Sequence, residues 1–267
     1  MAPTESAILG MLQGILEWLP ISSTGELVII MTQFLGYDPQ DAADLSFFLH
    51  LGTVGSAALY LRRDIVRILG GVRHYRPGYG RPADGVITFL AVSTILSGAM
   101  GFLIFRYAAD AAISGEFLLG MVGVALIATG IVLYASKKQI GTRTADSLTL
   151  RDTVLLGAVQ AFSAIPGLSR SGVTISALLM RGYSAQESLR LSFLMGIPAI
   201  LAAQVGLLLV YGPPDAAPVD LLVGLAFSFA FGYASIRILV GIASRVSFWW
   251  FAIIVGSVAL LSFAGML

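Results

Sequence analysis

Six stretches of about 20 mainly apolar residues run through this sequence, and a helix of that length crosses the hydrocarbon core of a bilayer. Their approximate bounds are 45–61, 86–105, 117–135, 191–211, 219–236 and 247–265. Only 12% of the residues are charged, which is about half the share in a soluble domain. The sequence therefore predicts an all-α polytopic membrane protein, with residues 1–267 in a single membrane domain.

The composition also excludes several classes of function. A net charge of +1 gives no field that would hold a nucleic acid, so we expect no nucleic-acid partner. The absence of cysteine excludes disulfides, thiolate metal sites and a cysteine nucleophile. No short basic segment precedes the first apolar region, so we expect no cleaved signal peptide.

Two further apolar regions, Glu5–Phe34 and Asp152–Met180, are interrupted near the middle by proline, glycine and hydroxyl residues. The interruptions read Pro20-Ile21-Ser22-Ser23-Thr24-Gly25 and Pro166-Gly167-Leu168-Ser169-Arg170-Ser171-Gly172. Irregular backbone is tolerated at membrane depth only where it is buried in protein or lines a wet cavity. We therefore expect two re-entrant helical hairpins, with these segments at their tips.

The two hairpins resemble each other at a constant offset of 147 residues. At this offset Gly10, Gln13, Ser22 and Gly25 fall on Gly157, Gln160, Ser169 and Gly172. Each hairpin is followed by three predicted spans. The chain therefore divides into one repeat over about residues 1–135 and a second over about residues 152–267, each made of a hairpin and three transmembrane helices.

The basic residues set the expected orientation, because loops rich in lysine and arginine stay in the cytoplasm. Apart from Arg106 and Arg170, all of the 16 lysines and arginines fall in connections that one topology places in the cytoplasm. In this topology the first hairpin enters the membrane from outside and the second from the cytoplasm. The repeats are then inverted, which is typical of folds that build a site near the midplane.

Ionisable residues at the hairpin tips indicate a functional site, because charges inside a membrane are costly. Glu17 and Glu26 flank the first tip, and Arg170 lies in the second. Gln13 and Glu17 are four residues apart and share a helix face that ends at the Ser22-Ser23-Thr24-Gly25 turn. Hydroxyls and free amides where a helix begins bind anions, and the guanidinium of arginine suits phosphate.

The second tip repeats this chemistry and completes the candidate anion site. Its candidate binding residues are Ser169, Arg170, Ser171, Gly172 and Thr174. An acidic residue beside a phosphate pocket indicates a cation between the two. Glu17 is therefore the candidate ligand of a hard divalent cation, Mg²⁺ or Ca²⁺.

The tip segments resemble the undecaprenyl-diphosphate phosphatase family of the bacitracin-resistance type. The residues that carry the resemblance are Gln13 through Gly25, then His50-Leu51-Gly52-Thr53, then Pro166 through Gly172. The resemblance covers essentially the whole chain. It implies removal of the terminal phosphate from a C55-type polyprenyl diphosphate, which recycles the lipid carrier for cell-wall glycans. Together with the topology, it places the active site at the outer leaflet of the plasma membrane.

The resemblance also implies roles for individual residues. It ties Glu17 to the divalent metal, with Gln13 as the other member of the motif. It links Ser22, Ser23, Thr24 and Arg170 to catalysis and diphosphate binding. This sequence departs from the family pattern at Glu26, where a histidine is usual, and at Ser46, where an acidic residue is common. Glu26 and His50 are therefore alternative candidates for proton transfer.

Other interpretations of the same residues stay open at this point. The hydroxyls could bond only their own backbone, and Glu17 with Arg170 could be a structural ion pair. Glu26 could face outer water, and His50 could be a core histidine. The main functional alternative is a flippase or transporter of a phospholipid or polyprenyl phosphate, because broken helices in inverted repeats are a transporter architecture. The length and type of the lipid also stay open, as does a homodimer.

The expected topology can be tested by thiol labelling, since the chain has no native cysteine. Cysteines introduced at Pro39 and Pro214 should react with a membrane-impermeant thiol reagent in intact cells, and one at Gly78 should not. The reverse labelling pattern would overturn the predicted orientation.

Overall fold

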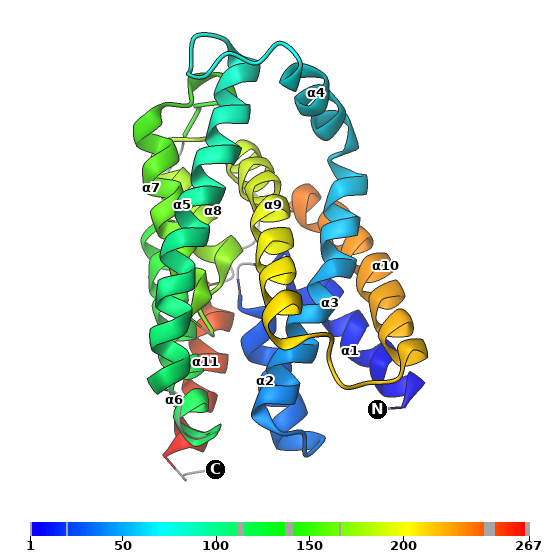
Figure 1. Ribbon diagram of the computed structural model, residues 1–267. Helices are drawn as coiled ribbons and strands as arrows, with labels where there is room; N and C mark the ends of the chain where they lie inside the picture. The colour runs from blue at the N-terminus through cyan, green and yellow to red at the C-terminus, as the bar shows by residue number, and fades with distance from the viewer. Residues whose placement is uncertain are drawn as a thin grey trace.

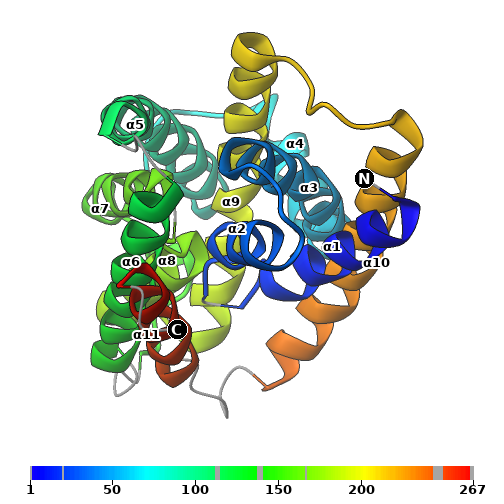
Figure 2. The ribbon, with the colours of Figure 1, turned by 90° about the horizontal axis from the view of Figure 1, so that it is seen from below.

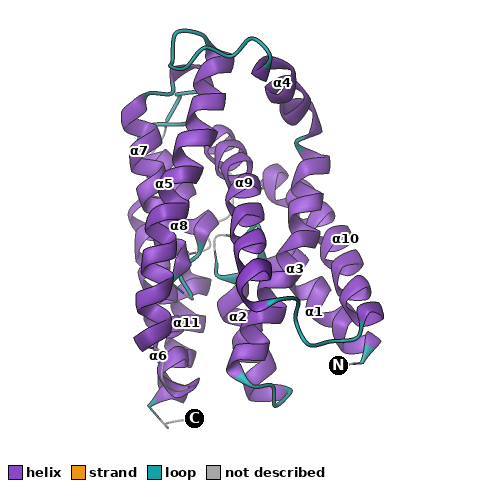
Figure 3. Cartoon of the chain, in the orientation of Figure 1, coloured by secondary structure: helices purple, strands orange, loops and turns teal. Residues whose placement is uncertain are grey.

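The computed structural model describes residues 2–19, 21–111, 115–136, 141–165, 167–242 and 249–264. This part of the chain consists of helices joined by loops, with one isolated bridge between Arg143 and Tyr183 (Figure 3). Pro20 and Pro166, which we expected to interrupt the two hairpins, lie outside the described residues.

Six helices coincide with the six predicted spans. They are α3 (Pro39–Tyr60), α5 (Pro82–Ala111), α6 (Gly115–Ser136), α9 (Ala185–Tyr211), α10 (Pro218–Ile242) and α11 (Trp249–Phe263). Within the described residues, α3, α5, α9 and α10 are each long and apolar enough to cross a membrane. The prediction of an all-α polytopic membrane protein is confirmed.

The two predicted hairpins are pairs of shorter helices. The first consists of α1 (Pro3–Leu16) and α2 (Ser23–Phe34); the second consists of α7 (Leu150–Ala161), the 3₁₀ turn η2 (Phe162–Ala164) and α8 (Arg170–Met180). The second helix of each hairpin begins after a serine cap. The Ser22 hydroxyl accepts from the Gly25 amide at 3.2 Å, and the Ser169 hydroxyl accepts from the Gly172 amide at 3.0 Å. The two tips thus share one local geometry, while the inverted relation of the repeats stays a prediction.

Two short helices complete the described chain. The helix α4 (Arg62–Val72) follows α3 after Leu61, and the 3₁₀ turn η1 (Ala145–Ser147) precedes α7. Figure 1 shows α4 at one end of the bundle, whereas α1 begins and α11 ends at the opposite end. The start of α1 and the end of α11 therefore lie at the same end of the molecule.

The helices of the two halves pack against each other reciprocally (Figure 2). The first hairpin helix α1 packs along α10, and its counterpart α7 packs along α5. Each hairpin therefore lies on the second span of the other half. The third spans, α6 and α11, pack on each other, and α9 contacts α3, α5 and α8. Both halves thus enclose the hairpin tips.

Glycine allows the close approach of α1 to α10. A Cβ atom on Gly10 would lie 2.2 Å from the carbonyl oxygen of Gly224, so the two backbones are in direct contact. The equivalent Gly157 on α7 faces α5, where a Cβ would lie 3.0 Å from the Cα of Ser93. Such small residues stabilise helix pairs in membranes, because close backbones gain van der Waals contact.

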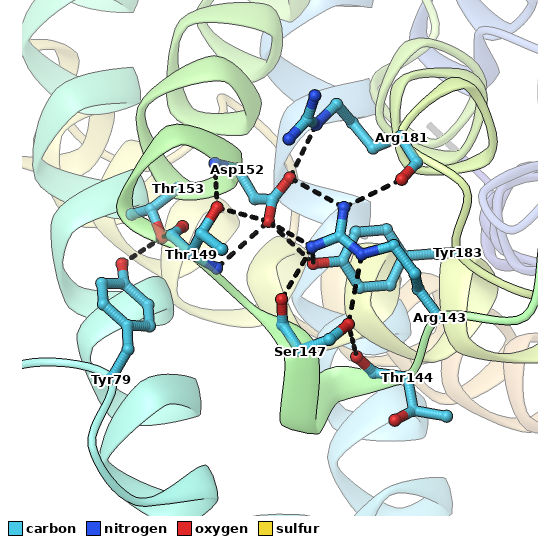
Figure 4. A network of polar contacts seen from close by, with 9 residues as sticks. All are labelled: Tyr79, Arg143, Thr144, Ser147, Thr149, Asp152, Thr153, Arg181 and Tyr183. Carbon is cyan, nitrogen blue, oxygen red and sulfur yellow. Dashed lines mark hydrogen bonds and ion pairs between the residues drawn. The ribbon is translucent and has the colours of Figure 1, made fainter.

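A buried carboxylate closes the open end of the second hairpin, where α7 begins and α8 has ended (Figure 4). Asp152 is fully buried and forms ion pairs with Arg143 at 2.8 Å and Arg181 at 2.7 Å. It also accepts from the hydroxyls of Thr149 at 2.7 Å and Tyr183 at 3.0 Å. Burial alone would raise the pKa of Asp152, but these hydrogen bonds outweigh burial and hold its pKa well below the usual range.

We expect Asp152→Asn to lower the free energy of unfolding by about 3 kcal/mol, because two partly buried arginines lose their counter-charge. Unfolding of the purified protein in detergent measures this. Asp146→Asn, an exposed substitution in η1, is the control and should change stability by less than about 0.5 kcal/mol.

Because folding lowers the pKa of Asp152, its stabilisation should be present above the ordinary aspartate pKa and disappear only as the pH falls towards the folded value. Equal stability of the two variants would contradict this role.

Candidate active site

The structure brings four of the predicted site residues together around the carboxylate of a fifth, Glu17. Arg170 Nη2 lies 2.8 Å from Oε1, and His50 Nε2 lies 3.0 Å from Oε2. Ser23 Oγ donates to Oε2 at 2.7 Å, and Gln13 Nε2 donates to the same oxygen at 3.0 Å. These residues come from α1, α2, α3 and α8 and the α1–α2 turn, and we call them the Glu17 cluster.

The cluster lies where two helices begin. Ser23 is the first residue of α2, and Arg170 is the first residue of α8. The first N–H groups of a helix carry the positive end of its dipole and favour an anion. Together with the guanidinium of Arg170, the two helix N-termini form a site that favours a bound anion. Glu17 is the anion at this site.

His50 faces an oxygen acceptor at each ring nitrogen. Its Nε2 faces the Glu17 carboxylate, and its Nδ1 lies 2.7 Å from the carbonyl oxygen of Ser46. A neutral imidazole donates from one ring nitrogen and accepts at the other, so the tautomer decides which of the two contacts His50 donates to. The ring is in direct contact with the Glu17 carboxylate, and His50 is therefore part of the Glu17 cluster.

Two groups on α9 that the sequence did not predict hold Arg170 in position. Its Nη1 donates to the carbonyl oxygen of Ser192 on α9 at 3.2 Å. A Cβ atom on Gly196 would lie 2.2 Å from the same nitrogen, so only glycine leaves room for the guanidinium. A signal was present in the sequence: Ser188, Ser192 and Gly196 are spaced four apart and form a line of small residues along α9.

Most of the other predicted tip residues hold the tips in place. Ser22, Gly25, Ser169 and Gly172 form the two helix caps described above. Ser171 Oγ donates to the carbonyl oxygen of Leu19 at 2.9 Å and so joins the two tips directly. Thr174 Oγ1 donates to the carbonyl oxygen of Arg170 at 2.7 Å. Thr174 Oγ1 also lies 2.7 Å from Ser192 Oγ on α9, and Ser169 Oγ lies 3.2 Å from Ser171 Oγ. The alternative that the tip hydroxyls bond only their own backbone therefore does not hold for Thr174 or Ser169.

Glu26 and Thr24 lie in the first turn of α2 but form none of the contacts of the Glu17 cluster given above. Glu26 is buried, and its Oε1 has no hydrogen-bond partner among the described residues. The alternative that Glu26 faces outer water is therefore wrong. Thr24 is half-buried.

A divalent cation can be matched to these residues in one arrangement. In the part of the chain that the structure describes, no group of three or more histidines and acidic residues is placed to hold a metal ion. Both oxygens of Glu17 accept from donors, but the buried Gln13 Oε1 has no partner among the described residues. Amide and carboxylate oxygens are ligands that Mg²⁺ and Ca²⁺ prefer. Gln13 Oε1 and the Glu17 carboxylate are therefore the groups of the cluster whose chemistry fits a hard cation.

Comparison with known proteins identifies the family of this chain. Residues 6–261 match the family model described as bacitracin resistance protein BacA. The chain belongs to the BacA family. This confirms the family that the tip motifs predicted.

Three relatives of this BacA-family chain carry the name undecaprenyl-diphosphatase. The protein of Methanococcoides burtonii is 39% identical over 262 residues, which are 97% of each chain. The protein of Haloarcula marismortui is 38% identical over 248 residues, 91% of this chain and 90% of the relative. The protein of Geobacter metallireducens is 32% identical over 275 residues, 98% of each chain. The similarity thus extends through both hairpins and all six spans.

The close contact between Gly196 and the Arg170 guanidinium can be tested by adding one methyl group at residue 196. We expect Gly196→Ala to push the flexible end of Arg170 away from Glu17 and to destabilise the protein by about 3 kcal/mol, because the buried carboxylate then loses its cation. Gly206→Ala on the same helix is the matched control, since a Cβ there meets no atom of the described residues within 4 Å. Thermal unfolding in detergent measures both variants, and equal melting temperatures would contradict the close fit at Gly196.

Proposed function

We propose that this protein hydrolyses undecaprenyl diphosphate, or another polyprenyl diphosphate, to the monophosphate and phosphate. One observation carries the proposal: the hydroxyl of Ser23 bonds the Glu17 carboxylate at 2.7 Å, beside Arg170 and two helix N-termini. A nucleophile bonded to a base, next to a centre for negative charge, is the arrangement that phosphoryl transfer requires. The BacA match and the name of the relatives support the same activity.

Substrate binding begins with an exchange of partners at Arg170. The terminal phosphate of the substrate takes the guanidinium from Glu17, because two parallel hydrogen bonds to phosphate suit the planar fork of arginine. Nη1 of Arg170 keeps its hydrogen bond to the carbonyl oxygen of Ser192, so the guanidinium rotates but stays at the same place between α8 and α9. The exchange leaves Glu17 Oε1 without a donor.

The Ser23 hydroxyl then attacks the terminal phosphorus. An Oγ–P bond forms, the hydroxyl proton passes to Glu17, and the bond between the phosphorus and the bridging oxygen breaks. The polyprenyl monophosphate leaves with the electron pair of that bond, while Arg170 and the first N–H groups of α2 and α8 stabilise the charge on the phosphoryl oxygens. Water next hydrolyses the phosphoserine, and inorganic phosphate is released.

A divalent cation is part of the same proposal. Glu17, freed from Arg170, and Gln13 Oε1 would hold it, and the bound ion would neutralise part of the diphosphate charge. We place the reaction at the outer leaflet of the plasma membrane, as the distribution of basic residues predicts. The product is then the lipid carrier for cell-wall glycans.

The alternative is a flippase that moves the lipid without cleaving it. Such a protein needs Arg170 to bind a phosphate, but it has no use for a serine activated by a carboxylate. The bond between Ser23 and Glu17 therefore favours hydrolysis. Phosphate release from C55 and shorter polyprenyl diphosphates by the purified protein, with and without EDTA, tests the proposal. Release that EDTA abolishes would support it, and no release at any chain length would favour transport.

We expect Arg170→Lys to lower the rate of phosphate release by about 100-fold, because lysine keeps the charge but loses the two-pronged contact with phosphate. Arg151→Lys, an exposed substitution at the start of α7, is the control and should keep full activity. Near-normal turnover of the Arg170 variant would mean that Arg170 only balances the charge of Glu17.

We expect Glu26→His to retain or increase activity, because it restores the residue that is usual in the family at a buried position without a hydrogen-bond partner for Oε1. His50→Ala should lose activity, because Glu17 loses the imidazole that lies 3.0 Å away. Rates of phosphate release for both variants check this. A folded but inactive Glu26→His protein would show that Glu26 has a specific role in this chain.

A further inference from the structure

The short helix α4 exposes a stripe of apolar side chains. Val66, Leu69 and Val72 are 70%, 66% and 53% exposed. They are three residues apart, so they lie along one side of the helix. Arg62, Arg63 and Arg67 are exposed on the same helix. A helix with an apolar stripe and arginines beside it is the type that lies in the surface of a membrane.

The other side of α4 is fixed to the bundle. Ile68 packs against the buried core that contains Leu61 and Phe193. Asp64 forms a two-pronged ion pair with Arg190 of α9, with Nη2 at 2.6 Å from Oδ1 and Nε at 3.2 Å from Oδ2. The apolar stripe therefore cannot turn inward unless this ion pair breaks.

The same ion pair affects the charge that α4 presents. Asp64 is the only acidic residue in the sequence of α4. Arg190 pairs with Asp64 from the side of the bundle and also with Glu187, and Arg67 Nη1 lies 3.5 Å from the same Asp64 carboxylate. Among the described residues no ion pair involves Arg62 or Arg63, so these two arginines keep their positive charge on the exposed side. The free face of α4 is thus both apolar and cationic, which matches a surface of anionic headgroups over acyl chains.

The position of α4 along the membrane normal supports the same partner. The preceding span α3 has 22 residues, a length of about 33 Å at 1.5 Å per residue. The hydrocarbon core is about 30 Å thick. Since α4 begins one residue after α3 ends, it starts at the level of the headgroups. Figure 1 shows it on the side of the bundle where α5 begins, opposite the start of α1.

We infer that α4 is a membrane-surface helix that binds anionic phospholipids of the adjacent leaflet. Its apolar stripe enters the boundary between headgroups and acyl chains, while Arg62, Arg63 and Arg67 contact the lipid phosphates. Basic side chains next to a membrane attract anionic lipids in this way, over distances limited by salt screening. The inference concerns the end of the bundle opposite the start of α1 and is independent of the proposed hydrolysis.

A fluorescent reporter on α4 tests the inference in the full-length protein. Gly70 is exposed, and a Cβ there meets nothing within 4 Å, so Gly70→Cys gives a unique labelling site in a chain without native cysteine. The protein carries an environment-sensitive dye at this site and is reconstituted in two kinds of vesicle. One kind is pure phosphatidylcholine, and the other contains phosphatidylcholine and phosphatidylglycerol at about three to one. We expect blue-shifted emission and stronger quenching by lipid-attached quenchers in the anionic vesicles.

Charge variants in the Gly70→Cys background make the test specific. Arg63→Gln with Arg67→Gln should remove the difference between the two kinds of vesicle. Arg76→Gln with Arg151→Gln removes the same charge from exposed arginines outside α4, and it should leave the difference unchanged. A detergent sample of each variant with the elution profile of the parent shows that the fold is intact.

Three outcomes would overturn the inference. Identical emission in both kinds of vesicle would mean that α4 does not recognise anionic lipid. Water-like emission in both would mean that the stripe is not inserted at all. Loss of the difference in the Arg76 and Arg151 pair as well would mean that general charge attraction, rather than α4, is responsible.

Discussion

Burying the Glu17 carboxylate among apolar helices costs free energy that only cations and hydrogen-bond donors can offset. Arg170 supplies the opposite charge, and His50, Ser23 and Gln13 lie within hydrogen-bond distance of the same carboxylate. These partners come from four helices, α1, α2, α3 and α8, and from both halves of the chain. The requirement to neutralise one buried carboxylate therefore determines where the two hairpin tips and α3 must meet.

The reciprocal packing of the halves provides the frame for that meeting. Because α1 lies on α10 and α7 lies on α5, each hairpin is supported by a span of the other half. Direct backbone contact between Gly10 and Gly224 leaves α1 little freedom to shift along α10. Ser171, which bonds the carbonyl oxygen of Leu19, then fixes one tip against the other. The frame thus keeps Ser23 and Arg170 on the same carboxylate.

Much of this arrangement could be predicted from the sequence, because bilayer thickness restricts apolar runs to spans and makes any interruption conspicuous. The spans, the hairpins and the approach of Arg170 to Glu17 followed from that restriction. The groups that position Arg170 could not be predicted in this way. Gly196 is one glycine among many in apolar helices, and its role depends on a contact between two helices that are not adjacent in the sequence. The helix α4 was also not predicted, because its arginines mark the segment as a polar connection although three apolar residues follow one another at helical spacing. Whether Glu26 is buried depends on how α2 packs, which its own sequence does not determine.

The ion pair between Arg170 and Glu17 joins residues 153 positions apart. A ribosome that feeds this chain into a membrane delivers Glu17 long before its partner exists. Until the second hairpin has been synthesised, the first tip holds an acidic group without its arginine, and α1 lacks the surface of α10 that will cover it. The first hairpin can therefore reach its final depth only late in biogenesis. Until then it stays at the membrane surface, where water solvates Glu17, or beside insertion machinery that tolerates a polar segment.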